Sequence, residues 1–349
     1  MDSTEQAKAL LEWYDRSRRI LPWREDPTPY HVWLSEIMLQ QTRVEAVRAY
    51  YLRFLEALPD IASLAAAPEE RWLKLWEGLG YYSRVRNLHK AAVQIMDQYG
   101  GQMPSSEKEL LGLPGIGPYT AAAIASIAFG QRTPAIDGNL LRIFARMTCY
   151  AGEIHALQTK KDARAYYENI IPGDRPGDFN QALMDLGAGL CLPGSAADCA
   201  ACPWQDCCRA HAEGRETDFP KTAKARERRI EKRTVLLIYH DGRVALDRRP
   251  ARGLLAGLCE FPNRKGELTE DQALEYVRGL GFSPVQIRPL TDAKHIFTHL
   301  EWHMKGYEVK TDEWKQKPAG GIFLADRQQL EEKYTLASAF AAYRQQLRI

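Results

Sequence analysis

Residues 110–130 of this 349-residue chain read LLGLPGIGPYTAAAIASIAFG and predict two helices joined by a tight turn. Ser106 and Glu109 precede the apolar run at the spacing of a capping box, which would begin the first helix. Gly115 and Gly117 each permit positive φ or close approach of the backbone, and the proline after them suits the first position of the second helix. Such a turn leaves backbone N–H groups facing outward at a helix N-terminus, where a phosphate can dock. An ordinary helical hairpin would show the same glycine pattern.

The apolar pattern on either side of this hairpin divides the chain into parts. Before residue 218, apolar residues recur at helical spacing, as in AKALLEWYDRSRRIL. Later, RTVLLIYHDGRVALDRR holds a D-G hairpin signal between β-rich segments, IFTHLEWHMKGYEVK alternates, and EDQALEYVRGLG and SAFAAYRQQL have helical patterns. We therefore predict a multidomain protein with an all-α domain (1–218), a basic linker (219–233) and a smaller α+β domain (234–349).

Composition and charge narrow the classes of function. Hydrophobic residues make up 45% of the chain and eight residues are tryptophan, which is enough for two packed cores. No stretch approaches the apolar length of a membrane span, so we expect no membrane association. The run KTAKARERRIEKR at residues 221–233 carries seven Lys or Arg against two Glu, and is either a solvated linker or a contact with a polyanion such as DNA. Nothing indicates an oligomer seam, so we expect a monomer.

Five of the seven cysteines crowd between residues 191 and 208. No signal-peptide apolar run opens the chain, so we expect an intracellular protein with reduced thiols, in which such a cluster predicts a metal site. Four thiolates suit a [4Fe–4S] cluster or a zinc ion, and the presence of a single C-x2-C pair favours iron–sulfur. Cys207 is an alternative to its neighbour as the fourth ligand. The cysteines that fit the spacing C-x7-C-x2-C-x5-C are Cys191, Cys199, Cys202 and Cys208.

Six strings in chain order resemble the adenine DNA glycosylases of the helix-hairpin-helix superfamily. They are WLSEIMLQQTRVEAV, GLGYYSRVRNLHKAA, LPGIGPYTAAAI, PAIDGNLLRIFAR, FNQALMDLGAGLC and the cysteine loop, and RPARGLLAGLCEFP with IFTHLEWHMKGY extends the match into the second domain. The resemblance implies a helix-hairpin-helix catalytic domain that holds a [4Fe–4S] cluster and contacts the DNA backbone through Gly115 and Gly117. It also implies a Nudix-like second domain, and monofunctional excision, by base flipping, of adenine mispaired with 8-oxoguanine or guanine in double-stranded DNA.

Two carboxylates suit the hydrolysis of an N-glycosidic bond. Glu36 lies among apolar residues, where burial would raise its pKa and keep a proton available near neutral pH, although it could equally be a partly exposed side chain. Asp137 directly precedes an apolar-periodic helix, which predicts an N-cap whose ionised form the helix dipole favours. The resemblance makes Glu36 the general acid that protonates adenine at N7 and handles the water. It makes Asp137 the group that stabilises, or transiently bonds to, the anomeric carbon. Asn139 would help to position the sugar or the water.

Tyr119 indicates a monofunctional rather than a bifunctional glycosylase. The endonuclease III relatives carry a lysine at the corresponding position, and its amine forms a Schiff base with the sugar. Tyrosine cannot do so, which argues against a pyrimidine-damage glycosylase/lyase and makes Tyr119 an active-site contact without lyase chemistry. A thymine- or uracil-mismatch glycosylase would share the helical core but not the Nudix-like domain. A non-catalytic iron–sulfur DNA-binding protein would not need both Glu36 and Asp137.

The resemblance also implies substrate contacts. Trp23 and Leu39, and the adjacent tyrosines of GLGYY, would otherwise be read as core. Motif alignment gives an adenine pocket of Trp23, Arg24, Leu39 and Gln181, and a set that wedges into the duplex and contacts the opposite strand, Gln41, Thr42, Leu79 and Tyr81.

Phe297, Thr298 and His299 resemble the F-S-H loop with which the family senses 8-oxoguanine. Threonine replaces serine, so the hydroxyl group is kept. The Nudix-like string ARGLLAGLCEF lacks the downstream carboxylates that bind the metal for pyrophosphate chemistry, so we expect no Nudix hydrolysis.

Overall fold

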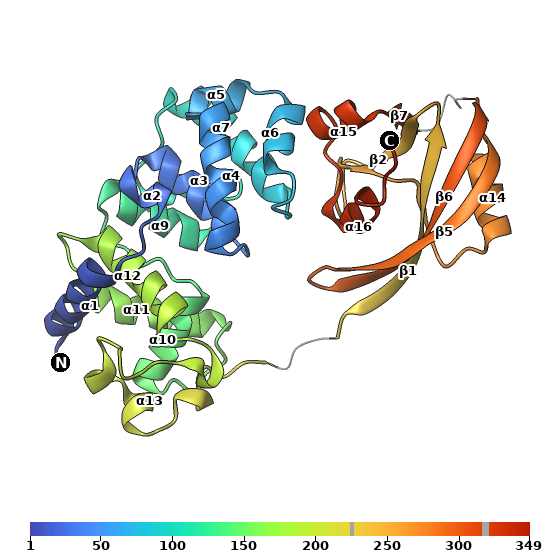
Figure 1. Ribbon diagram of the computed structural model, residues 1–349. Coiled ribbons are helices and arrows are strands. Elements are labelled where there is room, and N and C mark those ends of the chain that lie inside the picture. Colours follow the sequence, from blue (N-terminus) through green and yellow to red (C-terminus); the bar gives the residue numbers. More distant parts are fainter. Residues whose placement is uncertain (224–226, 316–320) are drawn as a thin grey trace. The chain divides into compact units, whose positions relative to one another are not determined.

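The computed structural model describes residues 1–223, 227–315 and 321–349 (Figure 1). The chain forms two compact units. The first comprises Met1–Ala66 and Ser83–Lys224, and the second comprises Ala67–Tyr82 and Ala225–Ile349. Residues 224–226, within the predicted basic linker, lie outside the described residues.

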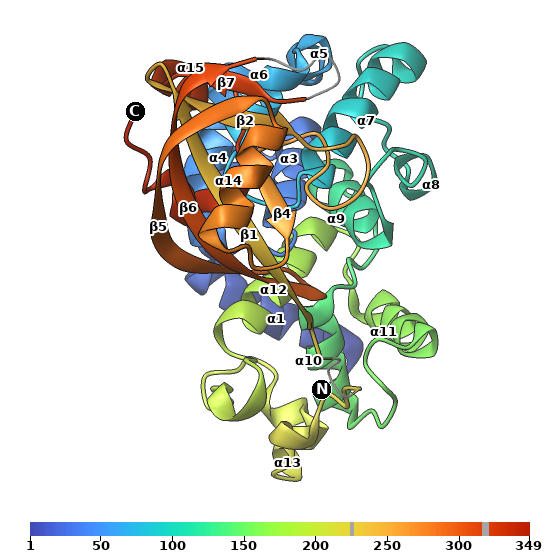
Figure 2. The same cartoon turned by 90° about the vertical axis from the view of Figure 1, so that its right-hand side faces the viewer.

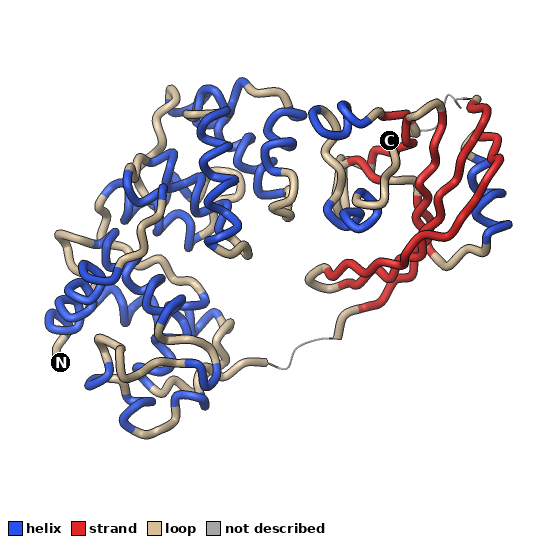
Figure 3. Tube along the Cα trace, viewed as in Figure 1, coloured by secondary structure: helices blue, strands red, loops and turns tan. Residues whose placement is uncertain are grey.

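The first unit is helical, as Figure 3 shows by colour. This confirms the predicted all-α fold of the first part of the chain. Within the described ranges, no helix of the protein is both long and apolar enough to cross a membrane. The helices of this unit are α1 (Ser3–Ser17), α2 (Pro22–Glu25), α3 (Pro29–Leu39), α4 (Val44–Ala57), α5 (Ile61–Ala66), α7 (Ser83–Tyr99), α8 (Glu107–Leu110), α9 (Pro118–Phe129), α10 (Gly138–Thr148), α11 (Leu157–Ile170), α12 (Pro176–Gly189) and α13 (Arg209–Ala212).

An apolar cluster shared by α1, α10, α11 and α12 anchors the cysteine loop. Trp204, from within that loop, is fully buried in the cluster beside Phe179, with ring centroids 6.5 Å apart. Its indole Nε1 donates to the Gln6 carbonyl oxygen at 2.9 Å. Burying a side chain of this size stabilises the fold by about 2–3 kcal/mol. The protein's own contacts at Trp204 therefore hold the loop to the core.

The α8–α9 hairpin forms at the predicted place. Ser106 caps α8, because its hydroxyl oxygen accepts from the Glu109 N–H at 3.2 Å. In a full capping box the Glu109 carboxylate would accept from the Ser106 backbone N–H. Here it accepts from the Ser106 hydroxyl instead, at 2.5 Å. Gly115 has φ +80°, and a Cβ there would lie 2.7 Å from the Asn87 Cβ. Gly117 is the N-cap of α9 at φ −94°, so of these two glycines only Gly115 uses the positive φ that both permit. Pro118 is the first residue of α9.

The second unit is a mixed sheet with helices, which confirms the predicted α+β class. The strand order is β3-β2-β1-β6-β5, with β4 paired to β1 and β7 to β2; β1 and β6 run parallel and the other pairs are antiparallel. Helix α14 covers one face of this sheet (Figure 2). The elements are α6 (Glu69–Trp76), β1 (Arg229–His240), β2 (Arg243–Arg248), β3 (Cys259–Glu260), β4 (Asn263–Lys265), α14 (Glu270–Gly279), β5 (Phe282–Ile296), β6 (Leu300–Trp314), β7 (Phe323–Ala325), α15 (Arg327–Glu332) and α16 (Ala341–Arg344).

Two stretches that the sequence pattern singles out lie in the sheet, the D-G turn and part of the basic run. Asp241 and Gly242 take φ +47° and +70° between β1 and β2, which is the two-residue hairpin turn that the D-G pair predicts. The basic run at 221–233 includes Arg229–Arg233, which form the first residues of β1 and pair with β6.

Polar contacts explain why residues 67–82 belong to the second unit. The Lys74 ammonium donates to the Leu330 carbonyl oxygen at 2.8 Å and pairs with Glu77 at 2.7 Å. Glu77 Oε1 accepts from the Leu336 N–H at 3.0 Å and from the Arg344 guanidinium at 2.9 Å. These bonds join α6 to the C-terminal helices across more than two hundred and fifty residues of sequence.

Candidate active site

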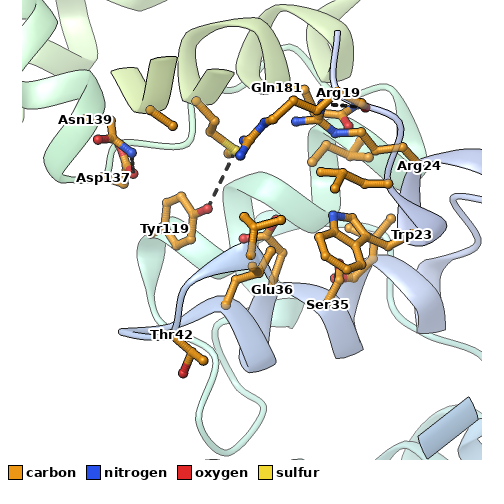
Figure 4. A pocket seen from close by; sticks show the side chains of 17 residues that line it. Arg19, Trp23, Arg24, Ser35, Glu36, Thr42, Tyr119, Asp137, Asn139 and Gln181 are labelled. Atoms are coloured by element: carbon orange, nitrogen blue, oxygen red, sulfur yellow. Dashed lines mark hydrogen bonds between the residues drawn. The ribbon is translucent and has the colours of Figure 1, made fainter. Parts of the chain in front are cut away.

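A pocket of about 190 Å³ lies in the helical unit, between α3, α9, α12 and the start of α10 (Figure 4). Several side chains that the sequence pattern does not single out also line it: Arg19, Leu21, Val32, Ser35, Val44, Ile127, Met184 and Ala188. The residues named from the sequence that line it are Trp23, Arg24, Glu36, Leu39, Thr42, Tyr119, Asp137, Asn139 and Gln181.

Glu36 is held in the pocket by helix α3. It is 6% exposed, and its Oε2 has no hydrogen-bond partner among the described residues. Burial raises the pKa of Glu36 to about 7; the nearby Asp137 carboxylate adds to the rise, whereas the Tyr119 hydroxyl and the Arg24 guanidinium lower it. The predicted burial and raised pKa are therefore confirmed, and a proton is available on Glu36 near neutral pH.

Tyr119 projects into the same space from the first turn of α9. Its hydroxyl lies 3.8 Å from the Met184 sulfur, and Figure 4 shows it beside Glu36. Burial, reinforced by the charges of Glu36 and Asp137, raises the pKa of Tyr119 well above its ordinary value. The phenol therefore stays protonated and can donate a hydrogen bond, but it offers no amine.

Asp137 is the N-cap of α10, as predicted. Its Oδ1 accepts from the Leu140 N–H at 2.8 Å, and its Oδ2 accepts from the Asn139 amide at 3.0 Å. Burial raises the pKa of Asp137, and the hydrogen bonds from Leu140 and Asn139 offset part of that rise. The cap therefore favours the ionised form, as expected, but against a larger opposing cost of burial.

A hydrogen-bond chain connects Asp137 to the cysteine loop. Asn139 donates to Asp137, and the Arg142 guanidinium donates to Asn139 Oδ1 at 2.9 Å. The same guanidinium donates to the Cys191 carbonyl oxygen at 2.8 Å. The position of Asn139 is thus fixed from both sides.

The turn after α3 is held by a buried arginine. Arg84, 8% exposed, donates to the carbonyl oxygens of Met38 and Gln40 at 2.8 and 2.6 Å and to the Thr42 hydroxyl at 3.2 Å. Gln41 between them is exposed, with φ +57°, and does not line the pocket. The Arg84 guanidinium therefore donates hydrogen bonds to carbonyl oxygens at the end of α3, where a helix leaves such groups without a partner of its own.

A second, smaller cavity of about 30 Å³ is formed by the cysteine loop. The Cys207 thiol does not face it and instead lies 3.5 Å from the Trp204 carbonyl oxygen. The Arg146 guanidinium donates to the Cys191 sulfur at 3.3 Å. Burial, with the neighbouring thiols, raises the pKa of Cys202 to about 12, so the thiols need a cationic group to be held together as thiolates. The thiols that line the cavity are Cys191, Cys199, Cys202 and Cys208.

Two further polar groups adjoin this cavity. His211 Nδ1 and Glu216 Oε1 are 2.6 Å apart, and their ligand atoms and the Cys199 sulfur lie within 4.8 Å of one another.

The predicted 8-oxoguanine loop lies in the second unit, at the tip of the β5–β6 hairpin. Phe297 packs edge-on against buried Trp302 with ring centroids 4.9 Å apart, whereas Thr298 and His299 are exposed. Within this unit the hydroxyl groups of Tyr81 and Thr298 share a hydrogen bond of 3.2 Å. Tyr81 is 48% exposed, whereas Leu79, from the same predicted set, is only 7% exposed.

Comparison with known proteins agrees with this geometry. Residues 34–170 match the HhH-GPD superfamily of base excision DNA repair proteins, and residues 233–346 match the NUDIX domain family. The helical unit, with two buried carboxyl groups in its pocket, is therefore that of a base excision DNA glycosylase.

The particular family follows from relatives that match most of the chain. The adenine DNA glycosylase of Mus musculus is 35% identical over 89% of this chain and 72% of its own length, and that of Homo sapiens is 32% identical over 98% and 73%. The chain belongs to the adenine DNA glycosylase family. The solved structure of a thermostable thymine-DNA glycosylase is similar with a TM-score of 0.55 and 28% identity, over 60% of this chain and 97% of that chain.

Proposed function

We propose that this protein is a monofunctional glycosylase that excises adenine paired with 8-oxoguanine or guanine in double-stranded DNA. Family membership supports the choice of adenine. The observation that carries the proposal is Glu36, a buried acid with a pKa of about 7, in a pocket that also contains Asp137. We expect the protein to act as a monomer inside the cell, where its clustered thiols stay reduced.

The base has to leave the duplex before it can be cut. Enzymes of this kind flip the target nucleotide into a pocket at a cost of a few kcal/mol. In this chain Trp23 and Leu39 offer apolar surface to the base, and Arg24 and Gln181 add polar groups to the lining of the same pocket.

The two carboxyl groups then divide the chemistry. Protonated Glu36 gives its proton to adenine N7, which makes the base a better leaving group as the bond from N9 to C1′ breaks. Ionised Asp137 faces the positive charge that develops on the sugar. A water oxygen bonds to C1′, and the proton that it loses returns to Glu36, so the acid is regenerated. Asn139, fixed by its bonds to Asp137 and Arg142, holds the sugar or the water in place.

Recognition of the opposite base is assigned to other residues. The exposed Tyr81 and the Phe297–His299 tip suit contact with 8-oxoguanine and the strand that carries it. A Cβ added at Gly117 would meet no atom of the described chain within 4 Å apart from those of its two neighbours in sequence, so the start of α9 is open for the DNA backbone. Gly115 shapes the same turn.

We also propose that the cysteine loop binds a [4Fe–4S] cluster. The donor set fits, because the four thiols line one cavity while Cys207 faces away. The ligands would be Cys191, Cys199, Cys202 and Cys208. The cluster would supply the cationic centre that holds these thiolates together, and its role here is structural.

The test is single-turnover base release from duplexes holding A opposite 8-oxoguanine, A opposite G, A opposite T, and 8-oxoguanine opposite C. We expect adenine release from the first two, with strand breaks appearing mainly after alkali because Tyr119 has no amine. A protein that binds these duplexes but releases no adenine would contradict the proposal. Breaks without alkali, or an adduct trapped by borohydride, would contradict its monofunctional part.

A further inference from the structure

Asp185 lies on α12 beside the pocket without lining it. Its helix presents Gln181 and Met184 to the pocket, whereas the Asp185 side chain is only 4% exposed and is directed to the segment that joins α1 and α2. The sequence pattern does not single it out, and the chemistry described above does not use it.

The Asp185 carboxylate binds two arginines at once. Its Oδ1 accepts from Arg19 Nε at 2.7 Å and from Arg24 Nη2 at 3.0 Å, and its Oδ2 accepts from Arg24 Nη1 at 2.7 Å. Arg19 Nη2 also lies 2.5 Å from Oδ1. Both arginines line the pocket, and Figure 4 shows them along the wall next to Gln181. One carboxylate thus fixes the orientation of two guanidinium groups in that wall.

Burial makes this pairing energetically important. The Arg24 side chain is 11% exposed, and a guanidinium so far from water is stable only with a hydrogen-bonded counter-charge. Arg19 is 39% exposed and is partly solvated. If Asp185 were neutral, two positive charges without a partner carboxylate would remain in the pocket wall.

We propose that Asp185 is a positioning residue that orients Arg19 and Arg24 for the flipped base and cancels much of the positive charge that they place near Glu36. This rests on the proposed function, because the charge matters only if Glu36 delivers a proton. The departing adenine becomes positively charged as it accepts that proton, and a wall with excess positive charge opposes the step.

The charge balance at Glu36 gives the sign of the effect. The groups that face it are Tyr119 from α9, Asp137 at the start of α10, and Arg24, with Arg19 further along the wall. The Arg24 guanidinium already lowers the pKa of Glu36. Removing the charge of Asp185 strengthens the positive field, so the pKa of Glu36 falls further and its proton is lost at a lower pH.

The test is the pH dependence of single-turnover adenine release by Asp185→Asn, which keeps the shape of the side chain and removes its charge. Excision should slow by about 100-fold because the pocket wall is no longer held in place. The alkaline limb of the profile should move to lower pH by roughly 0.5 to 1 unit.

The matched control is Asp178→Asn. Asp178 is on the same helix, pairs with Arg175 at 2.8 Å and does not line the pocket. Its substitution therefore removes one negative charge from α12 away from the pocket wall. The wild-type rate and profile are expected for this variant. If wild type itself releases no adenine, the proposed function fails; if wild type is active but Asp185→Asn leaves the alkaline limb where it was, the inference alone is overturned, whatever happens to the rate.

Arg19→Gln keeps the inference testable if Asp185→Asn does not fold. Arg19 is partly exposed, so this variant removes one positive charge from the wall with little risk to the fold. The Asp185–Arg24 pair remains, the field at Glu36 becomes less positive, and the alkaline limb should move to higher pH. A limb that stays in place or moves to lower pH would overturn the charge-balancing role.

Discussion

The pocket of the helical unit and the hairpin tip of the Nudix-like unit place their polar groups in opposite surroundings. Glu36 is 6% exposed and burial shifts its pKa toward neutrality, whereas Thr298 and His299 are exposed to solvent. Proton transfer needs a group removed from water, because desolvation tunes the pKa and strengthens each charge interaction. Reading a base edge needs side chains that reach into DNA. The comparison therefore predicts that substitutions in the pocket reduce the rate of excision. Substitutions at the tip should instead weaken discrimination between 8-oxoguanine and guanine as the opposite base.

The largest effect is expected for Asp137→Asn. Asparagine keeps the cap on α10, because its side-chain oxygen can still accept from the Leu140 N–H, but it removes the negative charge that faces the sugar. Single-turnover adenine release should fall by about 1000-fold while affinity for the duplex changes little. An excision rate within about tenfold of wild type would show that the charge of Asp137 is not part of the chemistry.

A comparison within the cysteine loop comes next. Cys202→Ser should lose the cluster, so that bound iron falls from about four atoms per chain toward zero and the unfolding temperature drops. Cys207→Ser is the matched control, because its thiol faces a backbone carbonyl rather than the cavity, and it should keep both. Iron analysis and thermal unfolding of the two purified variants decide the matter. If Cys207→Ser lost its iron and Cys208→Ser kept it, the fourth ligand would be Cys207 and not Cys208.

His299→Ala tests the tip with a smaller effect. Discrimination of A:8-oxoguanine from A:G should weaken by about tenfold, which is the loss of one good hydrogen bond or ring contact. Release of adenine at saturating protein should continue at the wild-type rate, since His299 lies at the tip and not among the pocket residues. Equal loss on both duplexes, or an unchanged preference, would remove the tip from recognition.

The smallest effect is the coupling of Tyr81 and Thr298. A double-mutant cycle with Tyr81→Phe and Thr298→Val isolates their hydrogen bond of 3.2 Å. We expect a coupling free energy of about 0.5–1 kcal/mol in the preference for 8-oxoguanine. Additive single effects would mean that the two hydroxyl groups act separately on the DNA.

The elements that depend on neighbours in sequence were predictable. The helical spacing identifies α1 and α14, Ser106 marks the start of α8, and Asp241-Gly242 identifies the β1–β2 turn, because each depends on contacts within a few residues. The glycine pattern did not say which of its two residues needs positive φ: Gly115 has φ +80°, whereas Gly117 is the extended N-cap of α9.

The features set by distant contacts could not be predicted in this way. Residues 67–82 belong to the second unit through bonds such as that from Lys74 to Leu330, and no local pattern records such a partner. Met184 and Ala188 line the pocket at three and seven positions after Gln181, so helical spacing could have added them once Gln181 was chosen. Arg19 gives no such signal, because its place in the wall depends on Asp185.

The central claim is that Glu36 supplies the proton for adenine excision from a buried site with a pKa of about 7. The most direct test is the single-turnover rate on the A:8-oxoguanine duplex across roughly pH 5 to 9, for wild type and Glu36→Gln. Because the protonated form is the active one, the wild-type rate should fall as the pH rises through about 7, and Glu36→Gln should be at least about 100-fold slower without that alkaline limb. A wild-type rate that stays level through this range, or a Glu36→Gln variant that keeps the same limb, would contradict the account.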